Sequence, residues 1–337
     1  MKKKFLITGS AGFIGYHLSL SLLKKGFKVV GIDNLNNYYS VKIKKDRNQE
    51  LRSYKNYKFY KIDINDEKKL DNIFIKEKFD IVINLAAQAG VRYSLVNPKA
   101  YINTNINGFF KILEASKNHK VKHFLFASSS SVYGANIKQP FSEKDTTDHP
   151  TSLYGATKKS NEVIAHSYSY VYNLPVSGLR FFTVYGPSGR PDMSLFLFVD
   201  AISKNKNVNL FNYGNMSRSF TYIDKVVDGV IKIAHNPPKI QKKHINRNIN
   251  SGTSVAPYEI FNLGNPKEIR LKNYLKIIQK KLNKKGKIKL KKMQIGDVKS
   301  TKADIKKFVN KFNFTLQYEI EQGIENFVKW YKSSKIK

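Results

Sequence analysis

Short apolar runs alternate with amphipathic segments over the first 180 residues of the chain. A short apolar run between polar or glycine residues predicts a buried strand, and apolar residues three to four positions apart predict a helix. We expect strands at residues 4–8, 27–32, 58–62, 81–85, 123–128 and 176–179. We expect helices from the first glycine-rich turn to about Lys25 and at 40–51, 67–75, 98–116 and 152–172. This alternation predicts an α/β fold, a doubly wound parallel sheet with right-handed crossovers.

The pattern changes near Phe181, where glycine, proline, asparagine and aromatic residues cluster. We interpret the stretch from there to Tyr222 as loop-rich and as part of a smaller substrate-binding lobe. A helix near 223–235 and a strand near 258–263 are expected to rejoin the sheet. Residues 236–256 combine two prolines with many lysines and are typical of a mobile insertion. The expected division is 1–180 with 223–265 for the nucleotide-binding domain, and 181–222 with 266–337 for the substrate-binding lobe.

A glycine-rich segment, Gly9-Ser10-Ala11-Gly12-Phe13-Ile14-Gly15, joins the first predicted strand to the first helix, and Asp33 ends the second strand. Strand, turn, helix, strand and acid in this order are the fingerprint of a Rossmann-type dinucleotide site. Gly9 permits the tight turn, Gly12 lets a pyrophosphate approach the backbone, and Gly15 allows helix and strand to pack closely. Asp33 can bind a ribose 2′-hydroxyl and would repel a 2′-phosphate, which favours NAD over NADP.

Tyr154 and Lys158 lie four residues apart on a predicted helix, about two dozen residues after the serine run 128–131. Residues at this spacing share a helix face. We expect the ammonium of Lys158 to favour the phenolate and to lower the pKa of Tyr154. A serine hydroxyl could then share the proton, and the set suits removal of a proton from a sugar alcohol while hydride leaves the same carbon. Asp33, Asp63, the segment 85–88 and the serine run all follow predicted strands, where a parallel sheet binds its ligands.

The composition excludes several classes of function. The formal net charge is +35, but 52 lysines against 8 arginines are spread along the chain without a basic tail, a zinc motif or an aromatic-basic repeat. Because nucleic-acid recognition depends on arginine and on such patterns, we expect lysine-rich solvated surfaces and no nucleic-acid partner. Cysteine is absent, and the seven histidines show no metal-ligand spacing, so we expect no metal. No run is apolar enough for a signal peptide or a membrane span, and we expect a cytoplasmic protein.

The order of these motifs resembles the extended short-chain dehydrogenase/reductases, more narrowly the NAD-dependent nucleotide-sugar 4-epimerases, and most closely the UDP-glucuronate 4-epimerases. The resemblance covers nearly the whole chain. The sequence differs from many relatives at Asn84, where they carry histidine. The segments that carry it are 33–39, 85–92, 128–134, 180–193, 218–224, 256–258, 262–265 and 296–298.

The resemblance implies a role for each matching residue. Ser129, Tyr154 and Lys158 match the catalytic residues, with Tyr154 as general base and Lys158 as its cofactor-bound partner. The expected NAD-binding residues are Gly9, Gly12, Phe13, Ile14, Gly15, Asp33, Asn34, Asp63, Ile64, Leu85, Ala86, Ala87, Gln88 and Asn105, together with Tyr154 and Lys158. The expected UDP-sugar-binding residues are Arg92, Ser130, Thr183, Arg190, Arg218 and Asp297.

Two local features narrow the reaction. Relatives that dehydrate or decarboxylate commonly place an acid just after the catalytic serine or threonine, whereas Ser130 and Ser131 follow Ser129 here. Neither hydroxyl is a good acid or base near neutral pH, which favours epimerisation alone. A uronate with a C4 ketone is a β-keto acid, so an epimerase must hold its carboxylate firmly. Arg92 and Arg190 are the candidates, unless Arg92 fixes a loop and Arg190 binds phosphate.

The leading hypothesis is therefore interconversion of UDP-glucuronate and UDP-galacturonate through a transient 4-keto sugar. A UDP-glucose or UDP-N-acetylglucosamine 4-epimerase is the near alternative, and a non-catalytic NAD-binding regulator on the same fold is the alternative from another class. The family suggests a homodimer through the helices predicted at 98–116 and 152–172. Their apolar faces permit such packing, but the same residues could equally cover the sheet.

Overall fold

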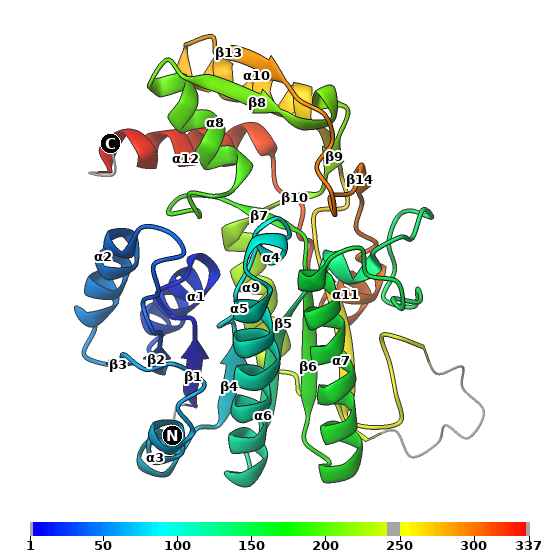
Figure 1. The fold of residues 1–337 in the computed structure, drawn as a ribbon. Coiled ribbons are helices and arrows are strands. Elements are labelled where there is room, and N and C mark those ends of the chain that lie inside the picture. Colours follow the sequence, from blue (N-terminus) through cyan, green and yellow to red (C-terminus); the bar gives the residue numbers. More distant parts are fainter. Residues whose placement is uncertain (1–2, 241–249, 335–337) are drawn as a thin grey trace.

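A seven-stranded parallel sheet forms the centre of the computed structural model, which describes residues 3–240 and 250–334 (Figure 1). The strand order is β11-β6-β5-β4-β1-β2-β3, and every neighbouring pair is parallel. The strands are β1 (Lys4–Thr8), β2 (Lys28–Ile32), β3 (Tyr57–Tyr60), β4 (Ile81–Asn84), β5 (His123–Ser129), β6 (Val176–Phe181) and β11 (Tyr258–Leu263). The predicted doubly wound parallel sheet is confirmed. The chain leaves β1 toward β3 and returns to β4 on the other side, so β1 and β4 flank the crevice where such sheets bind ligands.

Helices cover both faces of the sheet. Val29 and Val30 are neighbours in β2 and pack into opposite hydrophobic clusters, because successive strand residues point to opposite faces. One cluster contains α1, α2 and α9, and the other contains α3, α6 and α7. The helices of this part are α1 (Phe13–Lys24), α2 (Val41–Arg52), α3 (Glu67–Glu77), α4 (Tyr93–Val96), α5 (Pro98–Tyr101), α6 (Phe109–Asn118), α7 (Leu153–Tyr172) and α9 (Ile223–Ala234).

The stretch from Phe181 to Tyr222 is more regular than the sequence predicted. It contains helix α8 (Ser194–Ser203) and several short strands, so the expectation of a loop-rich region is wrong. Helix α8 has the sequence SLFLFVDAIS and buries five apolar side chains, and a helix that is apolar on most sides shows no amphipathic period. Of the predicted insertion 236–256, residues 241–249 lie outside the described residues.

Most of the remaining elements lie in the upper part of Figure 1, above the carboxyl ends of the strands. Strands β8 and β13 pair in parallel and lie with α8, α10 and α12. The elements are β7 (Thr183–Tyr185), β8 (Asn207–Leu210), β9 (Ser217–Arg218), β10 (Phe220–Tyr222), β12 (Ile269–Arg270), α10 (Leu271–Leu282), β13 (Lys287–Leu290), β14 (Ser300–Thr301), α11 (Lys306–Phe312) and α12 (Ile320–Ser333). Across 3–240 and 250–334, none of the helices has the length and apolar character needed to cross a bilayer.

Candidate active site

A cavity of about 1040 Å³ lies at the carboxyl ends of the strands and is lined by both parts of the chain. Every residue predicted for catalysis, cofactor or substrate lines it, with the exception of Asn105. On the sheet side these are Gly9, Gly12, Phe13, Ile14, Gly15, Asp33, Asn34, Asp63, Ile64, Leu85, Ala86, Ala87 and Gln88. The others are Arg92, Ser129, Ser130, Tyr154, Lys158, Thr183, Arg190, Arg218 and Asp297.

The glycine-rich turn has the geometry that a dinucleotide phosphate needs. Gly9 has a φ of +68°, and its carbonyl accepts a 2.9 Å hydrogen bond from the Gly12 amide. A Cβ on Gly15 would lie 2.1 Å from the Gly9 oxygen, so only glycine fits there. A Cβ on Gly12 would meet only that same carbonyl, which leaves the rest of its surface open to the cavity. The residues present therefore fit a dinucleotide at the start of α1.

Asp33 closes this turn from the end of β2. Its carboxylate accepts from the amides of Ala11, at 3.1 Å, and Leu35, at 2.8 Å. Burial raises the pKa of Asp33, and these two amides together with nearby Lys44 and Arg47 counteract that rise. The Asp33 carboxylate borders the cavity. An acid at the end of this strand binds the ribose 2′-hydroxyl of NAD, whereas NADP sites have an arginine there for the 2′-phosphate.

Asn34 and Asp63, both expected to bind NAD, contact each other. The Asn34 amide donates to Asp63 at 2.7 Å, and Asn65 donates to the same carboxylate from its backbone and its side chain at 2.9 Å each. Burial works to raise the pKa of Asp63, but these hydrogen bonds outweigh it and hold the pKa below its usual value. Ile64 packs against Gly108, where a Cβ would lie 2.6 Å from the isoleucine side chain.

Asn105 lies behind the cavity, in a π-helical segment, η1 (Ile102–Gly108), that interrupts the single helix predicted at 98–116. Its side chain accepts from the Gln88 amide at 2.8 Å and donates to the Gln88 carbonyl and the Thr157 hydroxyl at 3.0 Å each. The Asn105 carbonyl accepts from Asn161 at 2.6 Å. A π-helical turn interrupts the regular i to i−4 hydrogen bonds of a helix and leaves a backbone carbonyl free. Here the free carbonyl of Asn105 connects η1 to α7. Asn105 thus joins η1 to α7 through Thr157 and Asn161, and the hydrogen bond of Lys158 goes to the Ala127 carbonyl instead.

The catalytic candidates meet where β5 ends and α7 begins. Ser152 caps α7 by accepting from the Gly155 amide at 3.1 Å, which places Tyr154 and Lys158 on its first turns. The Lys158 amine donates to the Ala127 carbonyl of β5 at 2.8 Å, and burial lowers its pKa to about 7. The Ser129 hydroxyl accepts from the Ser131 amide at 3.2 Å.

The expected effect of Lys158 on Tyr154 is wrong for this structure. Burial raises the pKa of Tyr154, and the groups that counteract the rise are the Ser129 hydroxyl and the charge of Arg190. The Lys158 amine instead faces the backbone of β5 and is itself easily neutralised because it is buried. The cation that acts on the phenol is therefore Arg190, from a segment that the sequence linked only with substrate.

Three of the residues expected to bind the UDP-sugar form one ion-pair group. Asp297 binds Arg218 at 2.8 Å and Arg92 at 3.5 Å. Arg218 also donates to the Val298 carbonyl at 2.7 Å, and the Arg92 guanidinium lies 4.6 Å from the centre of the Phe211 ring. Burial lowers the pKa of Arg218, and Asp297 counteracts this. Arg218 and Asp297 were both expected to bind the UDP-sugar, but the sequence did not indicate that they bind each other.

Three further cavity residues were missed. Asp192 binds Arg190 through both of its oxygens, and Tyr38 donates to Asp192 at 3.1 Å. Phe211 follows β8 and supports Arg92. Tyr38 and Asp192 lie inside the segments 33–39 and 180–193 that carried the resemblance, so their presence there was the available signal. Phe211 carried no such signal.

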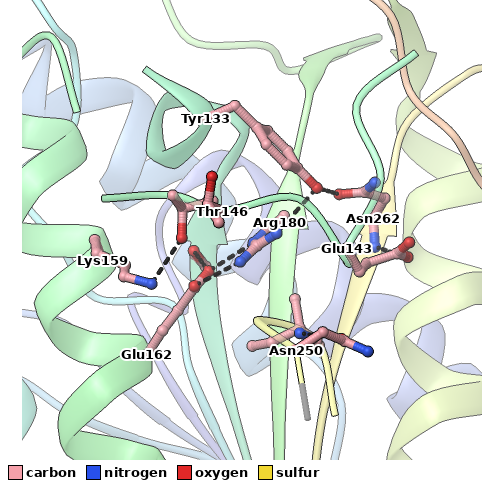
Figure 2. A network of polar contacts seen from close by, with 12 residues as sticks. Tyr133, Glu143, Thr146, Lys159, Glu162, Arg180, Asn250 and Asn262 are labelled. Carbon is pink, nitrogen blue, oxygen red and sulfur yellow. Dashed lines mark hydrogen bonds and ion pairs between the residues drawn. The ribbon is translucent and has the colours of Figure 1, made fainter. Parts of the chain in front are cut away.

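A buried polar network centres on Glu162 and Arg180 (Figure 2). Glu162 of α7 binds Arg180 of β6 through two hydrogen bonds and accepts from Ser128 at 2.6 Å. Arg180 also donates to the Tyr133 hydroxyl at 3.0 Å, which in turn donates to Asn262 of β11 at 2.7 Å. The network thus joins α7, β5, β6 and β11 behind the residues that face the cavity.

Comparison with known proteins gives a consistent result. The family model described as GDP-mannose 4,6 dehydratase matches residues 6–327. Protein CapI of Staphylococcus aureus is 46% identical over 328 residues, covering 97% of this chain and 98% of CapI. A probable UDP-glucuronate 4-epimerase of Rhizobium meliloti is 40% identical over 329 residues, covering 97% and 96%. The crystal structure of UDP-glucuronic acid 4-epimerase from Bacillus cereus, in complex with UDP-glucuronic acid and NAD, matches with a TM-score of 0.87 and 30% identity, covering 98% of this chain and 99% of that chain.

Proposed function

Because the chain belongs to the GDP-mannose 4,6 dehydratase family, among the extended short-chain dehydrogenase/reductases, we propose that it is an NAD-dependent 4-epimerase that interconverts UDP-glucuronate and UDP-galacturonate. The observation that carries the choice of substrate is Arg190. This arginine lines the same cavity as Tyr154 and Ser129, and its charge acts on the Tyr154 phenol. A cation at the reacting end of the cavity suits a sugar with a carboxylate there.

The catalytic steps follow from the residues at the cavity. Tyr154 takes the proton of the sugar 4-hydroxyl, and the Ser129 hydroxyl shares that proton by hydrogen bonding to the phenol. Bound NAD would supply the redox chemistry, taking up a hydride from C4 and returning it. After the 4-keto sugar has turned so that the hydride returns to the opposite face of C4, Tyr154 gives the proton back to O4. Lys158 lines the cavity, and its buried amine would hold the nicotinamide ribose of bound NAD.

The uronate and its nucleotide are held at opposite ends. Arg190 and Thr183 bind the carboxylate, with Ser130 as a further hydroxyl donor, so that the C–CO₂ bond of the keto acid stays out of the geometry for decarboxylation. Arg218 anchors the diphosphate, and Asp297 faces the uridine ribose. Neither Ser130 nor Ser131 supplies the acid or base that an elimination would need, which supports simple epimerisation.

The two parts of the chain bind different ligands. We assign 1–180 with 223–265 to NAD and 181–222 with 266–337 to the UDP-sugar. The partition is supported by β11, which pairs with β6 in the central sheet.

The protein acts as a homodimer through η1–α6 and α7. On these helices Phe109, Ile112 and Leu113 are buried against the sheet, whereas Val163 and Val171 are more than half exposed. The buried residues cover the sheet, and the exposed ones remain for a second copy of the chain.

Product analysis tests the function. Purified protein loaded with NAD is incubated with UDP-glucuronate, and the sugar is followed by NMR with a parallel assay for released CO₂. We expect UDP-galacturonate at an equilibrium ratio and no CO₂. UDP-glucose and UDP-N-acetylglucosamine serve as neutral comparators, and turnover of these alone would refute the uronate assignment. Arg190→Leu should abolish uronate turnover while the affinity for UDP stays near that of the wild type, whereas equal loss of both would count against Arg190 as the carboxylate ligand.

A further inference from the structure

Arg190 has only part of its guanidinium group committed inside the protein. Its Nε donates to Asp192 Oδ1 at 2.9 Å and its Nη2 donates to Asp192 Oδ2. These two nitrogens form one edge of the planar group. Within the described part of the chain Nη1 has no hydrogen-bond partner, and it is not fully buried. The edge formed by Nη1 and the second proton of Nη2 is thus open, on a side chain that lines the cavity.

Asp192 is itself held from a different part of the fold. The Tyr38 hydroxyl donates to Asp192 Oδ2 at 3.1 Å, and it comes from the segment that follows β2 on the cofactor side. The Tyr38 ring packs against Tyr93 with 4.9 Å between ring centres, and a Cβ on Gly90 would lie 2.7 Å from the Tyr38 oxygen. Burial, followed by the charge of Asp192, raises the pKa of Tyr38 to about 12, so the hydroxyl stays a donor at neutral pH.

We propose that Asp192 is the positioning residue for uronate recognition: held by Tyr38, it binds one edge of Arg190 and thereby presents the other edge to the substrate carboxylate. This inference rests on the proposed function. Arginine offers two edges that can each bind a carboxylate with two parallel hydrogen bonds. Asp192 uses the first, and its negative charge keeps the guanidinium from moving toward the phosphate end of the cavity.

The arrangement also governs how Arg190 acts on the catalytic phenol. The charge of Arg190 works to lower the pKa of Tyr154, and Asp192 partly neutralises that charge. If Asp192 positions Arg190, its replacement by asparagine lets Arg190 turn away, so the lowering effect of Arg190 on the pKa of Tyr154 weakens and the acid limb of the pH–rate profile shifts to higher pH. A residue that served only local folding would leave this limb in place.

Charge repulsion and positioning predict opposite changes in uronate affinity when Asp192 is neutralised. Asp192 and the substrate carboxylate carry like charges near one guanidinium, so Coulomb repulsion alone predicts tighter uronate binding once Asp192 is neutral. Positioning predicts the opposite. An asparagine can accept from only one of the two guanidinium nitrogens, and its own NH₂ group faces the other donor, so Arg190 would turn away from its present orientation.

The test compares Asp192→Asn with wild type, both loaded with NAD, by calorimetric titration with UDP-glucuronate, UDP-glucose and UDP. We expect Asp192→Asn to bind UDP-glucuronate roughly tenfold or more weakly, as loss of a charge-assisted contact implies, with UDP and UDP-glucose unchanged. Tyr38→Phe should act in the same direction with a smaller effect, and it keeps the test open if Asp192→Asn folds poorly. The matched control is Glu325→Gln, which breaks the surface ion pair between Glu325 of α12 and Lys281 of α10. This variant should bind all three ligands as the wild type does.

Unchanged or tighter binding of UDP-glucuronate by Asp192→Asn would overturn the proposal, and so would an equal loss for all three ligands. Failure of the proposed function is a separate result. It would appear in the wild-type protein, as absence of any preference for UDP-glucuronate over UDP-glucose and absence of epimerised product.

Discussion

Glu162 and Arg180 form an ion pair in the interior, with Nε–Oε1 and Nη2–Oε2 distances of 2.9 and 2.8 Å. Both side chains are almost completely buried, and Arg180 is 0% exposed. Glu162, labelled beside Arg180 in Figure 2, lies one helical turn beyond Lys158 on α7. It also accepts from Ser128, the residue before Ser129. The pair therefore ties α7 to β6, and the hydrogen bond from Ser128 ties α7 to β5, the strand that ends at Ser129.

Arg180→Met should destabilise the fold, because it leaves the Glu162 carboxylate buried without its partner. Removal of one member of a buried ion pair costs about 3–5 kcal/mol. Urea denaturation of the NAD-free protein, followed by circular dichroism, measures the loss. The control is Lys281→Met, which removes one member of the pair with Glu325 at the surface and should cost no more than about 1 kcal/mol.

The double variant Arg180→Met/Glu162→Leu distinguishes the missing partner from lost packing. Replacing a whole buried pair with apolar side chains is often neutral, so the double variant should recover much of the stability that the single variant loses. If both variants are equally unstable, the shape of Arg180 rather than its charge holds this region.

Tyr154→Phe should lower kcat by about 10²–10⁴-fold, the range typical for loss of a general acid–base group. The affinity for UDP-glucuronate should stay within a few fold of wild type, because the phenol hydroxyl contributes little to ground-state binding compared with the charged groups. Steady-state kinetics and calorimetric titration measure the two quantities. Tyr170→Phe, an exposed tyrosine of the same helix, is the control. Retained activity in Tyr154→Phe would favour a non-catalytic NAD-binding protein.

Local patterns were sufficient to predict the nucleotide-binding part of the fold. The helix expected at 40–51 is α2 (Val41–Arg52), and the strand expected at 258–263 is β11. These elements have a clear apolar period or a short run bounded by turn residues. Helix α8 was missed because it is apolar on most sides. The π-helical turn at Asn105 was also missed, since its partners Gln88 and Thr157 are 17 and 52 residues away.

In the candidate site, too, the residues of local motifs were predicted and the contacts between distant segments were not. Motifs within one segment located the cavity residues, because each motif carries its own spacing. Contacts between segments were not predictable: Arg218 and Asp297 are separated by 79 residues, and Tyr38 and Asp192 by 154. The error over Tyr154 has the same origin. Its pKa depends on burial and on Arg190, which no i, i+4 spacing reveals.

His123 should make the fold sensitive to acid. Its Nδ1 lies 3.2 Å from the Ala234 carbonyl and its Nε2 lies 2.9 Å from the Ser177 hydroxyl, so the neutral imidazole donates to the first and accepts from the second. Burial lowers the pKa of His123 to about 3. The unfolded chain takes up this proton near pH 6.5, so between pH 6.5 and 3 the unfolded state binds more protons and stability falls as pH falls.

Urea denaturation at pH 7 and pH 4.5 measures this dependence. Between these two values His123 should account for a loss on the order of 2–3 kcal/mol, which His123→Gln should not show. His149→Gln replaces an exposed histidine and should keep the full pH dependence of the wild type. Equal slopes for His123→Gln and wild type would mean that other groups cause the acid sensitivity.

An exposed apolar stripe on η1–α6 and α7 should mediate dimerisation. Ile102 and Phe110 are exposed by 45% and 43%, and Val163 and Val171 by 57% and 61%. Charged residues in the centre of such an interface would be desolvated without partners, so Val163→Glu/Val171→Glu should dissociate the dimer. Light scattering after size exclusion should change from twice 38.7 kDa to 38.7 kDa. Ile288→Glu, on the exposed strand β13, should leave the mass of the dimer unchanged, and a monomeric wild type would refute the proposed interface.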